Sequence, residues 1–417
     1  MLTARSLMIG GWLLLLAAGC NAPTTQDDPL LTQLISADTS LRYEVAHRDS
    51  LEIQILYTRI DRDSLNQPHF TSHGFGLDSS SYFYPASTIK LPIAVMALEK
   101  LQDLKSYKVN KFTTVFHDSA FSGQRPIRFD PSAETGLPSM AQYIRKVLMV
   151  SDNNASNALY EFLGQQEAND RVRKKGYHIR VLHRLSRAAT IEENRHTEGV
   201  WFTRNDSVLL RLPPQANPDS IRPSRKVYKG IGYREGDRLI QKPFDFTYKN
   251  EFPLQDQQDI LKAILFPFSM PPARQFNISD DDRRFLMQYM SQYPRETNWP
   301  PYYRDTTLYD AAVKYLMVAQ QKQPISPSIR IFNKIGGAYG YLIDNAYIVD
   351  FDHGIEFMLS AVINTNRDGI YNDDRYDYET IGYPFLRKLG QCIYRYELTR
   401  PRAHKPDLSA FRITYDR

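Results

Sequence analysis

Cysteine is scarce in this chain, and Cys20 and Cys392 are the only two in 417 residues. If Cys20 carries a lipid, as argued below, Cys392 has no partner in the chain, so we expect no structural disulfide. The sequence has no H-E-x-x-H pair and no cysteine set, so we expect no metal. A G-x-S-x-G elbow and a dinucleotide glycine fingerprint are also missing, and we expect no cofactor.

The chain also lacks a large excess of either positive or negative charge. The 52 basic residues nearly balance the 47 acidic ones, which leaves a net charge of +5 and no long basic block. We therefore expect no nucleic-acid partner. Beyond the N-terminus no apolar run is long enough for a transmembrane helix. The length and the 42% of hydrophobic residues allow a sizeable buried core.

The N-terminus has the pattern of a signal peptide. One positive charge in residues 1–5 precedes an apolar run over residues 7–18, which is too short to span a bilayer. Small residues then lead to Cys20, as in a bacterial lipobox, although Ala17 stands where leucine is usual. We predict a signal peptide over 1–19, lipid on Cys20, a tether over 20–30, and an exported lipoprotein that is membrane-anchored and periplasmic or surface-facing. The alternative is a plain secretory signal with an incidental cysteine.

Strand-like patterns occur at both ends of the chain, and helix-like patterns lie between them. Strands are predicted over 51–57, 70–76, 329–334, 345–351 and 355–364, and helices over 30–47, 91–98, 140–165, 254–266, 280–292, 307–321 and 376–390. This order predicts an α+β fold whose sheet uses both chain ends. The predicted parts are a sheet part over 31–85 and 326–397, a helical part over 86–325 with an enlarged insertion at about 195–325, and a tail over 398–417.

Ser87 and Lys90 stand one helical turn apart, at the start of the apolar run over 91–98. Residues three apart share a helix face, so the hydroxyl and the amine can point into one site. A serine is a poor nucleophile until a base takes its proton, and a buried lysine with a lowered pKa can be that base. Free N–H groups at the helix start can stabilise an oxyanion. The alternative is a capping serine with a surface lysine, and the apolar flank argues against it.

A second pattern, Ser151-Asp152-Asn153, joins the two pieces of the predicted 140–165 helix. Here a serine hydroxyl can relay a proton to a leaving nitrogen, and an asparagine amide can hold a substrate carbonyl. All three residue types also favour a helix cap, which is the plainer explanation.

A third pattern begins at Lys334, which ends a β-branched strand and precedes Gly336 and Gly337. A lysine at this place can attract a carboxylate, and glycines let a ligand approach the backbone. Taken alone, the pattern favours an ordinary hairpin turn.

In chain order, S-x-x-K, S-D-N and K-x-G resemble the signature of the class A β-lactamases and penicillin-binding proteins. The resemblance covers roughly residues 50–195 and 325–390, and it implies an antiparallel sheet with helices beside a helical domain. It implies that Ser87 is acylated, that Lys90 activates it and that Ser151 shuttles a proton. The backbone N–H groups of Ser87 and Gly337 would form the oxyanion hole. The substrate-binding residues implied are Asn153, which positions the substrate, Lys334, which meets its carboxylate, Gly336 and Gly337.

Two positions depart from the family pattern. Ile335 replaces the usual threonine or serine, and a ligand carboxylate left without that hydroxyl loses about 1–3 kcal/mol. The glutamate that activates water for deacylation has Glu192 as its candidate, with Glu193 beside it, somewhat further downstream than in the family. A solvated surface acid is the alternative. Without this base the acyl-enzyme would be long-lived.

The function expected from this resemblance is a serine hydrolase that opens β-lactam amide bonds through an acyl-enzyme on Ser87. The first alternative is a penicillin-binding-protein-like D-Ala-D-Ala peptidase or another cell-wall amide hydrolase. The second is a non-catalytic binding lipoprotein. The joint presence of five polar residues argues against it, namely Ser87, Lys90, Ser151, Asn153 and Lys334. The expected partner is accordingly a small β-lactam or a cell-wall peptide.

Overall fold

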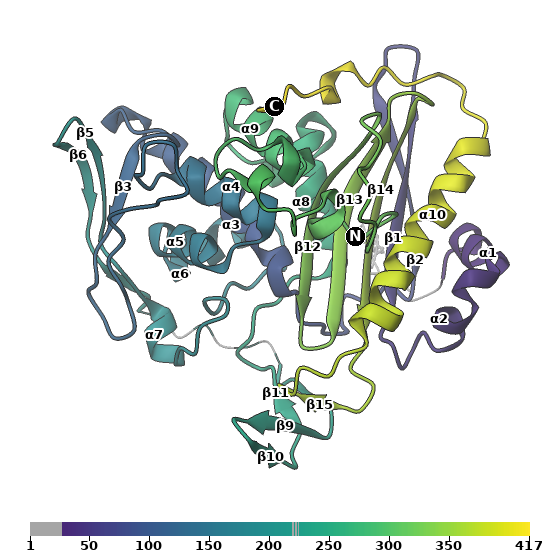
Figure 1. Cartoon of the computed structure of the whole chain (residues 1–417), viewed down its shortest axis with the longest axis horizontal. Helices are drawn as coiled ribbons and strands as arrows, with labels where there is room; N and C mark the ends of the chain where they lie inside the picture. The colour runs from purple at the N-terminus through teal and green to yellow at the C-terminus, as the bar shows by residue number, and fades with distance from the viewer. Residues whose placement is uncertain (1–26, 219–220, 222, 224) are drawn as a thin grey trace, which may run out of the picture.

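The computed structural model describes residues 27–218, 221, 223 and 225–417, so the predicted signal peptide and Cys20 lie outside the described residues. A five-stranded antiparallel sheet in the order β12-β13-β14-β1-β2 forms one half of the molecule (Figure 1). Its strands are β1 (Gln54–Arg62), β2 (Pro68–Phe75), β12 (Ile329–Ala338), β13 (Tyr341–Asp350) and β14 (Ile355–Asn364). Strands from both chain ends share this sheet, which confirms the predicted α+β class.

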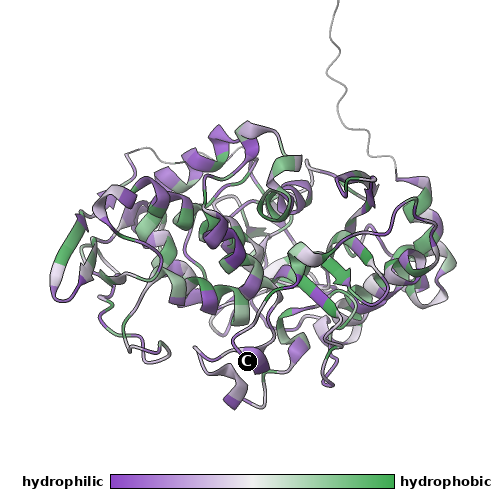
Figure 2. Ribbon diagram, turned by 90° about the horizontal axis from the view of Figure 1, so that it is seen from above, coloured by the Kyte–Doolittle hydropathy of each residue, from purple (hydrophilic) through white to green (hydrophobic). Residues whose placement is uncertain are grey.

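Both faces of the sheet are buried. Successive side chains of a strand point to opposite faces, and so Tyr347 and Met358 pack against the helical part while Ile348 and Phe357 pack on the other side. Helix α8 (Leu254–Leu265) covers the first face, and α1 (Pro29–Ala37) and α10 (Tyr383–Thr399) cover the second. Seen from above, the strands lie between helices (Figure 2). Burial on both faces explains why apolar residues occupy successive positions in β13 and β14.

The helical part is built around α3 (Lys90–Asp103), which is buried from Lys90 to Leu101. It packs against α4 (Met140–Val150) and α5 (Asn153–Leu163), with α6 (Gln165–Lys174) and α9 (Asp280–Ser291) further out. The predicted break between α4 and α5 is confirmed, as are the helices at 254–266 and 280–292. Among the described residues, no helix is both long and apolar enough to cross a membrane.

The helix predicted over 307–321 is wrong. Only the short 3₁₀ turn η8 (Asp310–Val313) forms there, because the backbone N–H groups of Tyr315 and Leu316 donate to the buried Asp344 carboxylate at 2.9 and 3.0 Å. Those donors are unavailable to a helical ladder, so a tertiary contact overrides the local pattern. The 30–47 helix is also interrupted, since Asp38 ends α1 and caps a new turn through Ser40.

The segment 195–253, for which the sequence showed no clear pattern, contains short strands. The described strands are β4 (His196–Thr197), β5 (Val200–Arg204), β6 (Ser207–Leu212), β7 (Gln215–Ala216), β8 (Tyr228–Lys229), β9 (Gly232–Glu235), β10 (Arg238–Ile240) and β11 (Phe244–Asp245). β5 and β6 extend β3 (Thr114–His117) at the edge of the helical part, and β9 pairs with β15 (Ile370–Tyr371). Strands β9, β10, β11 and β15 make a small module below the β12–β13 turn (Figure 1).

We expect the ion pair between Arg62 and Glu356 to hold β1 and β14 together. The Glu356 carboxylate is 1% exposed, and Arg62 meets it with two nitrogens at 2.6 and 2.8 Å. Removing one partner leaves a buried charge unpaired, so Glu356→Ala should lower the free energy of unfolding by about 3–5 kcal/mol. Guanidinium denaturation followed by circular dichroism measures this. The exposed pair Arg173–Asp170 is the control, since Asp170→Ala should cost less than about 1 kcal/mol. Equal losses in the two variants would contradict the assignment.

Candidate active site

Ser87 lies in the 3₁₀ turn η2 (Ala86–Ile89), directly before α3, and strand β12 passes close beside it. A Cβ placed on Gly336 would stand 2.7 Å from the Pro85 carbonyl oxygen and 3.2 Å from the Ser87 nitrogen. Only glycine therefore lets β12 approach the serine this closely. Gly336, which the sequence predicts to bind substrate, lies against the backbone of Ser87. This contact brings β12 next to the proposed nucleophile.

The Lys90 side chain is completely buried, and its amine faces oxygen atoms of the α4–α5 turn. It contacts the Ser151 carbonyl, donates to Asn153 Oδ1 at 2.6 Å and stands 3.3 Å from Ser151 Oγ. Burial lowers the pKa of Lys90 from its ordinary 10.5 to about 7, although nearby Asp152 opposes the change. An amine with this pKa is partly neutral near pH 7 and can accept a proton.

Ser151 and Asn153 owe their positions to the turn between two helices. Ser151 ends α4 with φ at 59°, and Asp152 caps α5 by accepting from the Ala155 nitrogen at 2.7 Å. The turn directs the Asn153 side chain between two partners, since its Nδ2 donates to Ser186 Oγ at 2.7 Å while its Oδ1 faces Lys90. The helix-cap explanation therefore holds for Asp152, and its two neighbours remain available to the site.

Lys334 reaches the same turn from β12. Its Nζ donates to Ser151 Oγ at 2.8 Å and to the Ile335 carbonyl at 2.9 Å, and the side chain is buried. Burial, reinforced by the charge of Lys90, holds the pKa of Lys334 well below its ordinary value. The Ser151 hydroxyl thus stands between two amines and can pass a proton from one side to the other.

A second layer of polar groups supports Lys334 from behind β12. Asn333 donates to Asp344 at 2.7 Å and accepts from the fully buried Lys314 amine at 2.8 Å. Lys314 also donates to the Met290 carbonyl at 2.7 Å, which ties α9 to the strand. These bonds fix the strand next to the predicted ligand, and a fixed strand keeps Lys334 directed at Ser151.

The Ser87 hydroxyl is half-buried and makes no hydrogen bond to any residue that the structure describes. The contact between Ser87 and Lys90 that proton transfer needs is thus not made in this state. A cleft of about 770 Å³ opens over the serine, and its lining includes Asn153 and Gly337. A ligand in the cleft would meet a free hydroxyl, with two low-pKa amines close to Ser151.

Several residues at the cleft have a left-handed backbone that side chains other than glycine rarely adopt. The φ angles are 48° at Ala86, 48° at Ser186 and 55° at Tyr339, which line the cleft, and 59° at Ser151, which contacts the buried Lys90. Each such residue costs on the order of 1–3 kcal/mol, and it persists only where surrounding contacts hold it. Strained residues therefore gather around Ser87, which indicates that tertiary contacts impose the geometry of the cleft on the backbone.

The structure does not bring Glu192 or Glu193 to the Ser87 cleft. Both lie on α7 (Ile191–Arg195), where Glu192 pairs with Arg195 and with His196 at 2.9 Å. Glu193 caps that helix by accepting from the Thr190 nitrogen at 2.8 Å. Within the described part of the chain, the acid that lines the cleft is Asp374, which is exposed to solvent.

Ile335 also lies outside the cleft. Its side chain packs in the apolar cluster on the α10 side of the sheet, so β12 offers no hydroxyl at this position. Other cleft residues were missed from the sequence, namely His183, Lys249, Phe244, Ser186 and Tyr339. They belong to no motif, and only Tyr339 had a signal, since it lies in the Gly-rich turn after Lys334.

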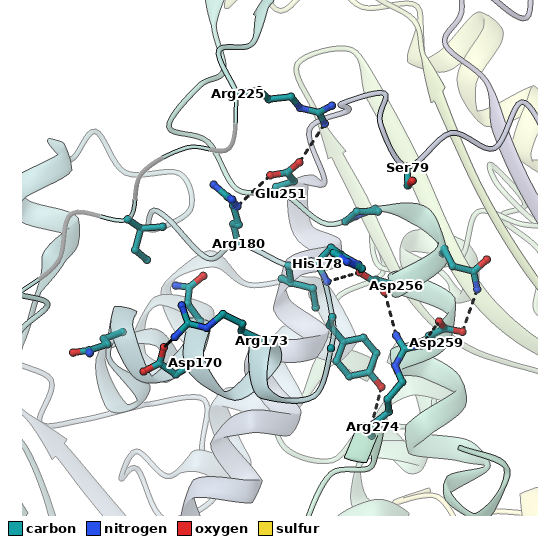
Figure 3. Close-up of a pocket in the computed structure, with 18 of the residues that line it drawn as sticks. Ser79, Asp170, Arg173, His178, Arg180, Arg225, Glu251, Asp256, Asp259 and Arg274 are labelled. Atoms are coloured by element: carbon teal, nitrogen blue, oxygen red, sulfur yellow. Dashed lines mark hydrogen bonds and ion pairs between the residues drawn. The ribbon is translucent and has the colours of Figure 1, made fainter. Parts of the chain in front are cut away.

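A larger groove, of about 1010 Å³, lies between α6 and the start of α8 (Figure 3). Its charged side chains pair with one another: Arg225 with Glu251 at 3.2 Å, and Arg274 with Asp256 and Asp259 at 3.2 and 3.0 Å. No member of the predicted catalytic set lines it. Size alone would select this groove, whereas the chemistry selects the smaller cleft at Ser87.

Solved structures that resemble the chain share little sequence with it. A β-lactamase from Burkholderia ambifaria is 14% identical at a TM-score of 0.45, covering 89% of this chain and 99% of the other. An ancestral class A β-lactamase is 14% identical at a TM-score of 0.44, covering 87% and 100%. PBP-A, as a point mutant in an acyl-enzyme complex with penicillin G, is 15% identical at a TM-score of 0.43, covering 88% and 94%.

No curated protein matches the sequence. A family model does match it, over residues 53–211, and that model describes the beta-lactamase enzyme family. The matched range contains the S-x-x-K and S-D-N segments and ends before Lys334. The resemblance inferred from the motifs is thereby confirmed: residues 53–211 match the model of the beta-lactamase enzyme family.

Proposed function

We propose that the chain is a serine acyl-transfer enzyme that opens β-lactam and related carboxylate-bearing amides by forming an ester on Ser87. One observation carries the proposal: Lys90, Ser151, Asn153 and Lys334 join in one hydrogen-bonded group beside a serine with a free hydroxyl. A binding lipoprotein has no physical need for two buried lysines, because each amine loses solvation without gaining an acid partner.

The reaction proceeds in two proton transfers. Neutral Lys90 takes the proton from Ser87 Oγ, which attacks the amide carbon while the N–H groups of Ser87 and Gly337 stabilise the oxyanion. The C–N bond then breaks, and the Ser151 hydroxyl passes a proton to the leaving nitrogen and is resupplied by Lys90. Lys334 binds the substrate carboxylate, and the negative charge of that carboxylate favours the protonated amine.

The site favours an enzyme that deacylates slowly, as a penicillin-binding peptidase does. Hydrolysis of the ester needs a base that activates water near Ser87, and the two glutamates expected for that role are engaged on α7. The exposed Asp374 is the acid of the cleft, and it follows β15 rather than α5. We therefore assign rapid acylation and slow release of the product.

A fluorescent penicillin should add covalently to the purified protein, and Ser87→Ala should abolish the adduct because it removes the proposed nucleophile, whose hydroxyl lines the cleft. Intact mass spectrometry and tryptic mapping locate the label. Ser79→Ala is the matched control, since Ser79 is exposed and lines the groove of Figure 3 instead. Labelling that survives in Ser87→Ala, or none on folded wild-type protein at millimolar reagent, would refute the proposed chemistry.

The rate of acylation should rise with pH through about 7, the pKa of Lys90. Only the neutral amine accepts the proton, so below that pKa the rate falls roughly tenfold for each pH unit, and above it the rate levels off. Stopped-flow labelling between pH 5.5 and 9 measures the profile, with thermal unfolding at each pH as the control for folding. A rate that is flat from pH 5.5 to 8.5, or one that still rises tenfold per pH unit up to pH 9, argues against Lys90 as the base.

The adduct should persist, and Glu192→Gln should change its lifetime by less than about twofold, because Glu192 is held by Arg195 and His196. A catalytic base would instead contribute about 10²–10⁴-fold. Intact mass followed over hours after removal of excess reagent measures release, and turnover of a chromogenic cephalosporin gives an independent rate. Rapid release in the wild type that slows in Glu192→Gln would identify Glu192 as the deacylating base.

A further inference from the structure

Aromatic rings from three distant parts of the chain line the Ser87 cleft. Tyr84 precedes the nucleophile, Phe244 belongs to β11 in the insertion, and Tyr339 forms the turn between β12 and β13. Tyr84 and Tyr339 pack edge to face at 5.0 Å between ring centroids, and Phe244 packs on Tyr339 at 5.4 Å. Through Phe244, the small module below the β12–β13 turn (Figure 1) thus contributes to the lining of the cleft.

The insertion also contributes a positive charge, on Lys249. Its ammonium lies 5.8 Å from the ring centroid of Phe244 and 5.7 Å from that of Tyr339, and the residue is half-buried in the cleft lining. Ring faces attract a cation but do not satisfy its hydrogen bonds. Within residues 27–218, 221, 223 and 225–417, no acceptor bonds this ammonium and no carboxylate pairs with it.

The other cations of the cleft are engaged. Arg184 pairs with Glu161 at 2.6 Å, and Arg187 donates to the Gly123 carbonyl. The charge of Lys249 acts on a neighbouring cleft residue. Burial, together with this charge, lowers the pKa of His183 to about 4. Lys249 is therefore the cleft cation that an incoming anion can pair with at the lowest cost.

Lys249 lines the cleft, whereas Lys334 is buried and is not among the lining residues. Lys334 extends from β12 to Ser151 at the α4–α5 turn, whereas Lys249 stands with Phe244 and with the turn that follows β12. A substrate that places one carboxylate at Lys334 can place a second one at Lys249. Because the ammonium is partly desolvated, an ion pair formed there is stronger than one at an open surface.

We propose that Lys249, flanked by Phe244 and Tyr339, is a subsite for a second carboxylate, carried by the substrate away from the reacting amide. The inference rests on the proposed function and narrows its substrate class to dianionic acyl donors, such as cell-wall peptides with an acidic side chain. The subsite comes from the insertion and is independent of the three motifs.

Three penicillins that share one ring system test the subsite. Their phenylacetyl side chains carry a carboxylate (carbenicillin), a hydrogen (benzylpenicillin) or an ammonium group (ampicillin) on the same carbon. The second-order rate of Ser87 acylation, measured by intact mass, should follow that order in the wild type. We expect a ratio of about ten between the first two reagents, which corresponds to about 1.4 kcal/mol. The ratio should shrink at high salt, as expected for a charge interaction.

In Lys249→Met the carbenicillin-to-benzylpenicillin ratio should fall at least fivefold, and Lys249→Arg should retain most of it. Comparing ratios between variants cancels the intrinsic reactivity of each reagent. Lys242→Met is the matched control, since Lys242 is an exposed lysine in the same segment outside the cleft, and its ratio should equal that of the wild type. Melting temperatures verify that each variant is folded.

Two results would overturn the inference. If all three penicillins label Ser87 and the ratio is the same in the wild type and Lys249→Met, the subsite does not exist while the proposed function stands. If none of the three labels the folded wild-type protein, the proposed function fails and the subsite fails with it.

Discussion

The burial of the Lys90 amine against the α4–α5 turn is the contact on which the site depends. It places a low-pKa amine beside Ser151 and Asn153, and it fixes the start of α3, directly after the η2 turn that contains Ser87. Lys334, on strand β12 of the sheet, donates a hydrogen bond to the Ser151 hydroxyl of the same turn. The site therefore exists only where the helical part and the sheet meet, and the packing of β12 on η2, which Gly336 permits, holds the two together.

Residues whose positions follow from local helix geometry could be predicted from the sequence. Ser87 and Lys90 were selected because one helical turn can bring them to one face. The break at Ser151 was predicted because three capping residues interrupt an apolar pattern. The all-apolar flank of α3 correctly indicated a buried lysine. The sheet could be predicted from both chain ends because β12, β13 and β14 are long and strongly apolar.

Features that depend on distant partners could not be predicted. Residues 307–321 have a helical pattern, but Asp344 captures two of their backbone N–H groups across the fold. Glu192 lies somewhat further downstream than the family's deacylating glutamate, and Arg195 and His196 hold it on α7. Lys249 and Phe244 have no motif, and they reach the cleft only because two-residue strands, too short to show a pattern, fold the insertion back beneath β12.

The pairing of β1 with β14 sets the order in which the chain can assemble. Gln54 lies opposite Val362, so the inner edge of the β1–β2 hairpin has no partner until about 300 further residues have been made. At roughly 5–20 residues per second, synthesis alone takes about 15–60 s to provide it. Throughout that interval β1 presents unpaired N–H and C=O groups and apolar side chains, the features that recruit foreign strands. Until β14 has been made, the unpaired edge of β1 is therefore the place where this chain is most exposed to aggregation, whatever the stability of the finished fold.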